Sequence, residues 1–137
     1  MYKIIIAIVA AYFVTQISKT IISYNETGKW DWAGLIFENG GMPSTHTSVV
    51  SALSFGLLFQ IGITYETIIA VVFSLIVAND AMKVRRETGE EAKVINTIID
   101  KENILHKHLI TRIGHTPMQV LIGAIVGIVC ALAVYMI

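Results

Sequence analysis

The chain has 137 residues, of which 55% are hydrophobic, with ten acidic and ten basic side chains. This apolar share exceeds that of an ordinary soluble domain and favours a membrane protein. The zero net charge gives no electrostatic reason to expect nucleic-acid binding, and the single cysteine, Cys130, excludes a disulfide framework. The length suits one domain that covers residues 1–137.

Four apolar segments predict an all-α membrane bundle of about four transmembrane helices. They are residues 4–18 (extendable to 22), 47–63, 67–82 and 117–137. A span needs about 20 mostly apolar residues, with a lower limit near 17, so the second and third are short. We expect a helix hairpin between these two, turning at residues 62–66. The first segment is interpreted as a retained helix rather than a signal peptide, because no clear small-residue cleavage site follows it.

A soluble all-helical bundle is the alternative fold class. Gly123 and Gly127 argue against it, because this spacing lets membrane helices approach each other closely. Polar residues collect in two stretches, 19–41 and 83–115. The second stretch is expected to be helical over residues 83–100 and then to form a loop.

The distribution of positive charge predicts an orientation. If the four spans cross the membrane in turn, both polar stretches lie on one side, and only Lys3 lies on the other. The positive-inside rule then places the polar face in the cytoplasm. The basic residues on that face are Lys19, Lys29, Lys83, Arg85, Arg86, Lys93, Lys101, Lys107 and Arg112.

Residues 40–47, Gly-Gly-Met-Pro-Ser-Thr-His-Thr, open the second expected helix. Ser44 is a good N-cap and Pro43 has a fixed φ angle, so His46 falls in the first helical turn. Gly41 lets the backbone approach a ligand closely. Free amides and the positive end of the helix dipole favour an anion at this position. An ordinary capped helix start with a surface histidine is the alternative interpretation.

Residues 114–117, Gly-His-Thr-Pro, open the fourth expected helix in a similar way. Thr116 suits the N-cap and Pro117 the first helical position, which leaves His115 just outside the helix. Because this construction occurs twice on one predicted face, we interpret the two starts as parts of a single anion site.

Charged residues follow the third apolar segment. On a continuous helix Asn79, Lys83 and Arg86 share a face, and Asp80 can pair with Lys83. Asp80 lies close to the hydrocarbon boundary, where an ionisable group is costly and marks a functional candidate. Arg85 and its basic neighbours suit a phosphate clamp. Their alternative role is to anchor the helix end at the lipid headgroups.

Lys19, near the end of the first helix, would reach the same face, either to bind phosphate or to extend toward the headgroups. A metal site built from His106, His108 and His115 is an alternative, but their spacing matches no zinc pattern. Solvated loop histidines are the preferred interpretation, so no metal and no other cofactor is expected.

Together these stretches resemble the divergent branch of the type-2 phosphatidic acid phosphatase superfamily, which also contains bacterial acid phosphatases and vanadium haloperoxidases. The resemblance covers residues 19–127. It is carried by residues 40–46 and 114–117 and, between them, by Asp80, Val84, Arg85, Arg86, Gly89 and Ala92.

The resemblance implies a metal-independent membrane phosphatase that forms a phosphohistidine. His115 would be the nucleophile and His46 the acid, with Asp80 as a third candidate catalytic residue. The phosphate-binding set would be Lys19, Ser44, Arg85, Arg86 and the amides near Gly41. Gln119 stands where the wider superfamily has an acidic residue. It favours the alternative of an inactive membrane protein that binds a lipid phosphate or a partner.

The expected substrate is a lipid phosphate, because the site would open at the membrane boundary. A cytoplasmic face favours phosphatidylglycerol phosphate or phosphatidic acid, and the reverse orientation favours a polyprenyl pyrophosphate. Four spans are fewer than the six helices common in the superfamily. A homodimer that completes the helix packing is therefore the expected partner, by analogy at the level of the fold.

Overall fold

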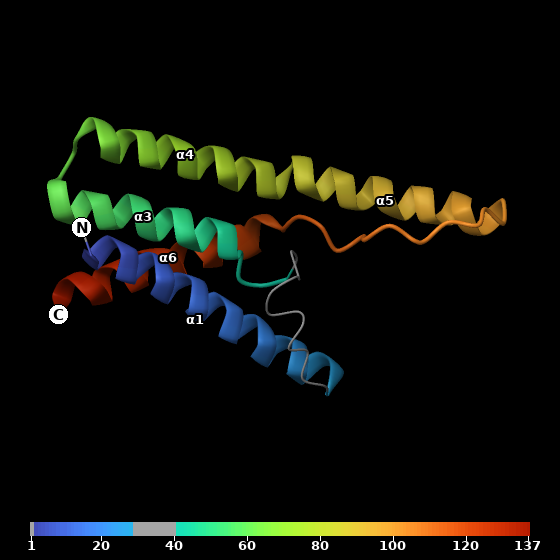
Figure 1. Cartoon of the computed structure of the whole chain (residues 1–137), viewed down its shortest axis with the longest axis horizontal. Helices are drawn as coiled ribbons and strands as arrows, with labels where there is room; N and C mark the ends of the chain where they lie inside the picture. Colours follow the sequence, from blue (N-terminus) through green and yellow to red (C-terminus); the bar gives the residue numbers. More distant parts are fainter. Residues whose placement is uncertain (1, 29–40) are drawn as a thin grey trace.

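The computed structural model describes residues 2–28 and 41–137, so Lys29 and Gly40 lie outside the described residues. Helices account for most of the described chain, and the described ranges contain no strand (Figure 1). The helices are α1 (Tyr2–Thr27), α3 (Thr45–Ile61), α4 (Tyr65–Met82), α5 (Val84–Lys101) and α6 (Pro117–Met136).

Three helical runs among the described residues are long and apolar enough to cross a membrane: α1, the run formed by α4 and α5, and α6. The fourth apolar helix, α3, has 17 residues, which is about the lower limit for a span. The predicted all-α membrane bundle is therefore confirmed. Gly62 ends α3 and Thr64 precedes α4, which confirms the expected hairpin.

The helix α3 lies at the centre of the bundle, in contact with α1, α4 and α6. Its backbone and that of α6 approach closely at two glycines. A Cβ atom at Gly123 would lie 2.5 Å from the Ser44 carbonyl oxygen, and one at Gly127 would collide with the Ser48 carbonyl. The spacing of these two glycines thus serves the close helix approach that the sequence predicts.

Small residues fill the interior, and large apolar residues point outward. Ala11, Ala52 and Cys130 form the buried cluster among α1, α3 and α6. The hydroxyls of Ser54 and Ser74 join α3 to α4 across 2.8 Å. Large side chains on α4 are exposed, among them Ile68, Ile69, Phe73, Leu75 and Ile76. Helices that associate in lipid show this pattern. Lipid tails are as apolar as the side chains, so burying large apolar residues between helices gives no hydrophobic stabilisation there.

Successive membrane helices run in alternating directions. Figure 1 shows both chain termini and the α3–α4 turn at one end of the bundle, with the starts of α3 and α6 at the other. Lys3 lies at the first end, with its ammonium group 5.7 Å from the Tyr135 ring centroid. The expectation that the spans cross in turn is therefore met by the bundle.

The helix α5 continues the direction of α4 past the bundle, and residues 103–116 run back beside it (Figure 1). We call residues 103–116 the return segment. The helices α4 and α5 are joined at Lys83, whose backbone N–H donates to the Asn79 carbonyl at 2.9 Å. The Asn96 side chain donates to the Leu109 carbonyl at 2.9 Å and accepts from the Leu109 N–H at 2.8 Å. The predicted polar helix and loop are thus present, and α5 has nearly the expected bounds.

Candidate functional site

The helices α3 and α6 both begin at hydroxyl N-caps, as the sequence predicts. The Ser44 hydroxyl accepts from the Thr47 N–H at 3.5 Å and lies 3.0 Å from the Thr47 hydroxyl. The Thr116 hydroxyl accepts from the Gln119 N–H at 3.3 Å, and the Gln119 side-chain oxygen accepts from the Thr116 N–H at 2.9 Å. Gln119 therefore completes a capping box.

Backbone contacts join these two helix starts to the α4–α5 junction. The Ser44 N–H donates to the Gln119 carbonyl at 3.1 Å, and the His115 N–H donates to the Ala81 carbonyl at 2.9 Å. Gly114 has a φ of +83°, and a Cβ atom there would collide with the backbone of Arg86. Three segments that are distant in the sequence thus meet at one end of the bundle. The meeting depends on backbone atoms and on the absence of a side chain at residue 114.

The His115 side chain is enclosed at this meeting point. It is 2% exposed, and among the described residues neither ring nitrogen has a hydrogen-bond partner. Burial lowers the pKa of His115 from 6.5 to about 4, assisted by the positive charges of Lys19, His46 and Arg85. The imidazole is therefore neutral at pH 7, with one ring nitrogen that carries a free lone pair.

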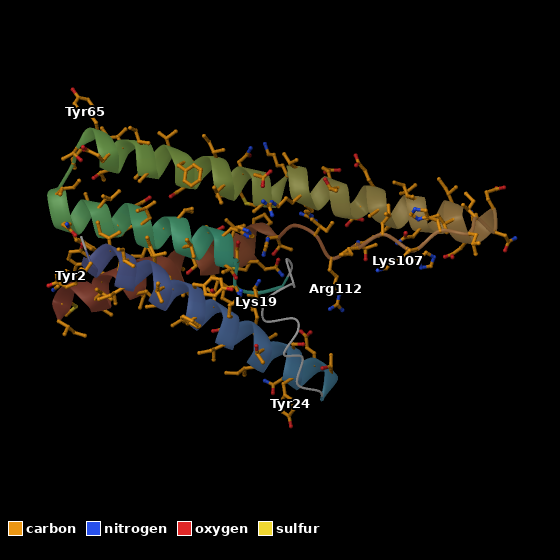
Figure 2. All side chains as sticks on the ribbon, viewed as in Figure 1. Tyr2, Lys19, Tyr24, Tyr65, Lys107 and Arg112 are labelled. Atoms are coloured by element: carbon orange, nitrogen blue, oxygen red, sulfur yellow. The ribbon has the colours of Figure 1, made fainter. Side chains whose placement is uncertain are left out.

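The charges that act on His115 identify the rest of the cluster. Lys19 comes from α1, His46 from the first turn of α3, and Arg85 from the start of α5. Figure 2 shows Lys19 where α1 passes the starts of α3 and α6. His46 differs from His115 in being exposed. The structure thus brings together the two histidines and two of the basic residues that the sequence singled out.

The Asp80 carboxylate pairs with Arg85 rather than with Lys83, the partner expected from the helix spacing. Its Oδ2 lies 2.6 Å from the Arg85 Nε. Both side chains are partly exposed, at 38% for Asp80 and 42% for Arg85. Because exposed pairs contribute little to stability, the effect of Asp80 is mainly to orient the guanidinium group beside the histidines.

Three predicted phosphate-binding residues stand apart from this charged cluster. Arg86 is exposed, approaches Gly114 through its backbone, and is absent from the charges that act on His115. The Ser44 side chain is fully buried, and its hydroxyl is used by the α3 cap. Gly41 is exposed, with a φ of +89°. The roles of all three in binding phosphate stay predictions.

The alternative metal site is not assembled. His106 and His108 lie on the return segment, where Nδ1 of His106 is 2.7 Å from the Lys107 carbonyl. Nε2 of His108 lies 2.8 Å from the Asp100 carboxylate. In residues 2–28 and 41–137 no three His, Cys, Asp or Glu side chains form a group that could hold a metal ion.

A hollow of about 480 Å³ between α5 and the return segment is lined in part by His106 and His108 and does not include His46 or His115. Its lining is mainly apolar and includes Ala92, Ile95, Leu109 and Ile110. Gly89 and Ala92, which carry part of the family resemblance, are buried where the return segment meets α5. Their small size is explained by the packing of the return segment against α5 at this position.

Three further polar residues that the sequence did not single out are buried in the bundle. Gln16 and Thr45 are each 8% exposed, and Ser48 is fully buried. Their side-chain oxygens have no hydrogen-bond partner in the described ranges. The available signal was the position of Gln16, three residues before Lys19 inside an apolar segment, because a polar residue in a membrane helix marks a functional candidate.

Comparisons with known proteins agree with the resemblance seen in the sequence. Residues 2–130 match the divergent PAP2 family, a name that refers to type-2 phosphatidic acid phosphatases. The uncharacterized membrane protein YuiD of Bacillus subtilis (strain 168) is 33% identical over 141 residues, which cover 90% of this chain and 87% of that protein. No solved structure matches this chain. The predicted family is confirmed.

Proposed function

We propose, on the premise that this chain belongs to the divergent PAP2 family, that it is a membrane phosphatase acting on a lipid phosphomonoester. The observation that carries the proposal is the convergence of His46 and His115, far apart in the sequence, with Lys19 and Arg85 at one end of a membrane bundle. Two imidazoles and two cations are the groups needed for phosphoryl transfer through a histidine.

In the proposed first step, a neutral ring nitrogen of His115 attacks the phosphorus. The bond from phosphorus to the lipid oxygen breaks, and the His46 imidazolium gives its proton to the departing alkoxide. In the second step, water attacks the phosphohistidine while His46 takes the proton of that water. Inorganic phosphate leaves, and both histidines regain their starting states. The residues supply every group in these steps, so the proposal includes no metal.

The depressed pKa of His115 supports its role as the nucleophile. Because burial and the neighbouring positive charges disfavour the imidazolium, the attacking nitrogen keeps its lone pair at neutral pH. Lys19 and Arg85 favour a bound phosphate dianion and would neutralise the charge on its oxygens in the transition state. Partial burial and the charges of Arg85 and Lys19 also lower the pKa of His46. The proposed acid role therefore requires the bound phosphate dianion to raise that pKa.

The location of the site supports a lipid substrate. The helices that surround it present large apolar side chains outward, and the cluster lies at the end of the bundle where three apolar helices terminate or begin. A cytoplasmic orientation favours phosphatidylglycerol phosphate or phosphatidic acid. The reverse favours the alternative substrate, a polyprenyl pyrophosphate, from which polyprenyl phosphate would depart in place of an alkoxide. Labelling of a cysteine introduced at Lys107, on the return segment, in intact cells and in inverted vesicles would decide the orientation.

The direct test is phosphate release by the purified protein in detergent micelles that contain phosphatidylglycerol phosphate, phosphatidic acid or a polyprenyl pyrophosphate. We expect turnover of one of these lipids in the presence of a chelator, and its loss in His115→Ala and His46→Ala. His108→Ala, on the return segment, is the matched control and should keep full activity. Unchanged turnover in both site variants would refute the assignment.

One observation favours a non-catalytic protein that binds a lipid phosphate. The Gln119 side chain is engaged in the capping box, and no described residue accepts a hydrogen bond from the His115 ring. An acidic partner that would stabilise a charged imidazole is therefore missing from the described part of the chain. Binding of a lipid phosphate by the wild-type protein without any turnover would establish this second candidate.

The predicted homodimer belongs to the proposal as well. Helix α4 contacts α3 and α6 on one side and exposes large apolar residues on the other. Lipid or a second copy of the chain would cover that surface. Sedimentation analysis in a density-matched detergent separates the two, because a dimer doubles the protein mass of the particle.

A further inference from the structure

We propose that Gln16 is a substrate-contacting residue, and that its amide and the Thr45 hydroxyl bind the oxygens of a tetrahedral oxyanion held by the histidine cluster. The inference rests on the proposed function, because it concerns the same site. Its starting point is a set of three buried polar side chains whose oxygens have no hydrogen-bond partner within residues 2–28 and 41–137. They are Gln16, Thr45 and Ser48, which we call the inner polar trio.

The position of the trio follows from the register of α1 against α3. The two helices run in opposite directions (Figure 1), and a Cβ atom at Gly56 would lie 3.5 Å from the Ile4 side chain. Further along, Ala11 and Ala52 belong to one packed cluster. These contacts set the register of the two helices. On α1 the buried residues continue from Ala11 to Thr15 and Gln16, and on α3 Thr45 lies seven residues before Ala52 on the same helix face.

Helix geometry places Gln16 level with the start of α3. At a rise of about 1.5 Å per residue, Gln16 lies about 7.5 Å beyond Ala11 along the helix axis. On α3, Ser48 lies about 6 Å beyond Ala52 and Thr45 about 10.5 Å beyond it. The backbone of Gln16 is therefore near the level of Thr45 and Ser48 along the bundle.

Neighbours of the inner polar trio along the helices belong to the charged cluster. Lys19, one helical turn after Gln16, acts on His115, and Thr45 precedes His46 in the first turn of α3. Because the trio is buried and His46 is exposed, the proposal places the uncharged trio on the inner side of the cations and imidazoles. A substrate phosphoryl group bound between the histidines would have its inward-facing oxygens at the trio.

The chemistry of the trio fits such oxygens. A buried polar group without a partner costs free energy, so three together in a small protein call for an explanation. The amide of Gln16 offers two N–H donors after a half-turn about its last side-chain bond, and the Thr45 hydroxyl offers another. Neutral donors bind an oxyanion without adding charge, and they leave the pKa of His115 under the control of burial and the cations.

The proposal predicts opposite effects of one substitution on the folding stability of the protein and on its affinity for an oxyanion. If Gln16 serves a ligand, replacing its unpartnered amide by an apolar side chain of similar size removes a cost of folding. Gln16→Leu should then melt at the same temperature as the wild type or higher, while it binds an oxyanion less well. A purely structural amide predicts the reverse, a lower melting temperature with unchanged binding.

The probe is orthovanadate, a phosphate analogue, titrated calorimetrically into the full-length protein in detergent. We expect Gln16→Leu and Thr45→Val each to weaken vanadate binding about tenfold or more, since hydrogen bonds to charged groups are the strong ones. Gln16→Glu keeps the size of the side chain and should weaken binding further by repelling the anion. Gln60→Leu is the control, because Gln60 is an exposed glutamine at the far end of α3 that accepts from the Tyr135 hydroxyl at 2.8 Å.

The outcomes separate this inference from the proposed function. Wild-type affinity in Gln16→Leu and Gln16→Glu overturns the inference, and lipid phosphate turnover by the wild type still supports the phosphatase. Weakened binding in these variants, together with no turnover by the wild type, supports the inference and refutes the phosphatase. A wild-type protein that neither binds vanadate nor turns over lipid phosphate overturns both. If Gln16→Leu fails to fold, Gln16→Glu and Thr45→Val carry the test.

Discussion

The starts of α3 and α6 have similar sequences and opposite environments. Each combines glycine, a hydroxyl N-cap, proline and histidine. His46 follows its N-cap and is exposed in the first turn, whereas His115 precedes its N-cap and is 2% exposed. A shift of the histidine from one side of the cap to the other thus decides whether the imidazole faces solvent or the protein interior.

Under the proposed function, this difference supports separate chemical roles for the two histidines. A solvent-facing imidazole exchanges protons readily, which suits an acid and base. An enclosed imidazole with a pKa lowered to about 4 stays neutral, which suits a nucleophile. If both histidines were interchangeable anion ligands, their replacement would have equal effects. The following predictions test whether they are unequal.

The largest expected effect concerns the leaving group. His46→Ala should lose about 10²- to 10⁴-fold in kcat on a lipid phosphate, the usual contribution of a general acid. On p-nitrophenyl phosphate the loss in the first chemical step should be much smaller, because nitrophenolate departs without a proton. His115→Ala should lose activity on both substrates. Rapid-quench measurement of leaving-group release in the first turnover checks this, because the second step uses His46 as the base for both substrates. Equal losses in the first step for His46→Ala would contradict its role as the acid.

The second prediction compares the glycines before the two helix starts. Gly41 and Gly114 both have positive φ angles, but only Gly114 lies against another backbone. Gly41→Ala should cost about 1–2 kcal/mol from backbone strain alone. Gly114→Ala adds a collision with Arg86 and should cost about 3 kcal/mol or more. Denaturant titration in detergent gives both values, and equal costs would mean that the contact with Arg86 is easily relieved.

The third prediction uses pH. The folded-state pKa of His115 lies below its ordinary value, so the unfolded chain binds the proton more readily. The stability contributed by neutral His115 is complete above about pH 6.5 and is lost as the pH falls toward about 4. The full difference is about 3 kcal/mol. Melting temperatures between pH 7.5 and 5 should fall more steeply for the wild type than for His115→Gln, and parallel curves would contradict the prediction.

The smallest expected effect belongs to Asp80. Asp80→Asn keeps the shape of the side chain but removes the charge that holds Arg85. Because the pair is partly exposed, we expect KM for the lipid phosphate to rise only about threefold to fivefold, with kcat nearly unchanged. Glu90→Gln breaks a similar pair with Lys93, 2.8 Å away on α5, and should change neither constant. A large loss of kcat in Asp80→Asn would instead show that Asp80 takes part in the chemistry.

Much of the fold could be predicted from the sequence because its signals are local. Apolar runs fix the membrane helices, and Ser44, Thr116 and Pro117 fix where two of them begin. The Gly123–Gly127 spacing predicts close packing and is used for it. The family resemblance also depends on short motifs, and the comparisons confirm it.

The missed features depend on contacts between distant segments. The spacing on α4 suggests Lys83 as the partner of Asp80, but the turn at Lys83 carries Arg85 to that carboxylate instead. The enclosure of His115 needs α4 and α6 to be in place. The capping role of Gln119 is local, by contrast, and the Thr-x-x-Gln spacing at residues 116–119 was its signal in the sequence. In the sequence, Gln16 is one polar residue in an apolar helix. Only the packing of α3 beside α1 brings Thr45 and Ser48 near its level along the bundle.

Two backbone hydrogen bonds hold the helix starts that carry the histidines: Ser44 bonds to Gln119, and His115 bonds to Ala81. They concern the stage at which this end of the bundle becomes ordered. Since these bonds involve no ligand, the entropy lost in bringing the two helix starts together is spent during folding. Under the proposed function, the two imidazoles are therefore aligned before a substrate arrives. Main-chain atoms carry this alignment, so side-chain substitutions nearby leave the hydrogen bonds that hold it in place.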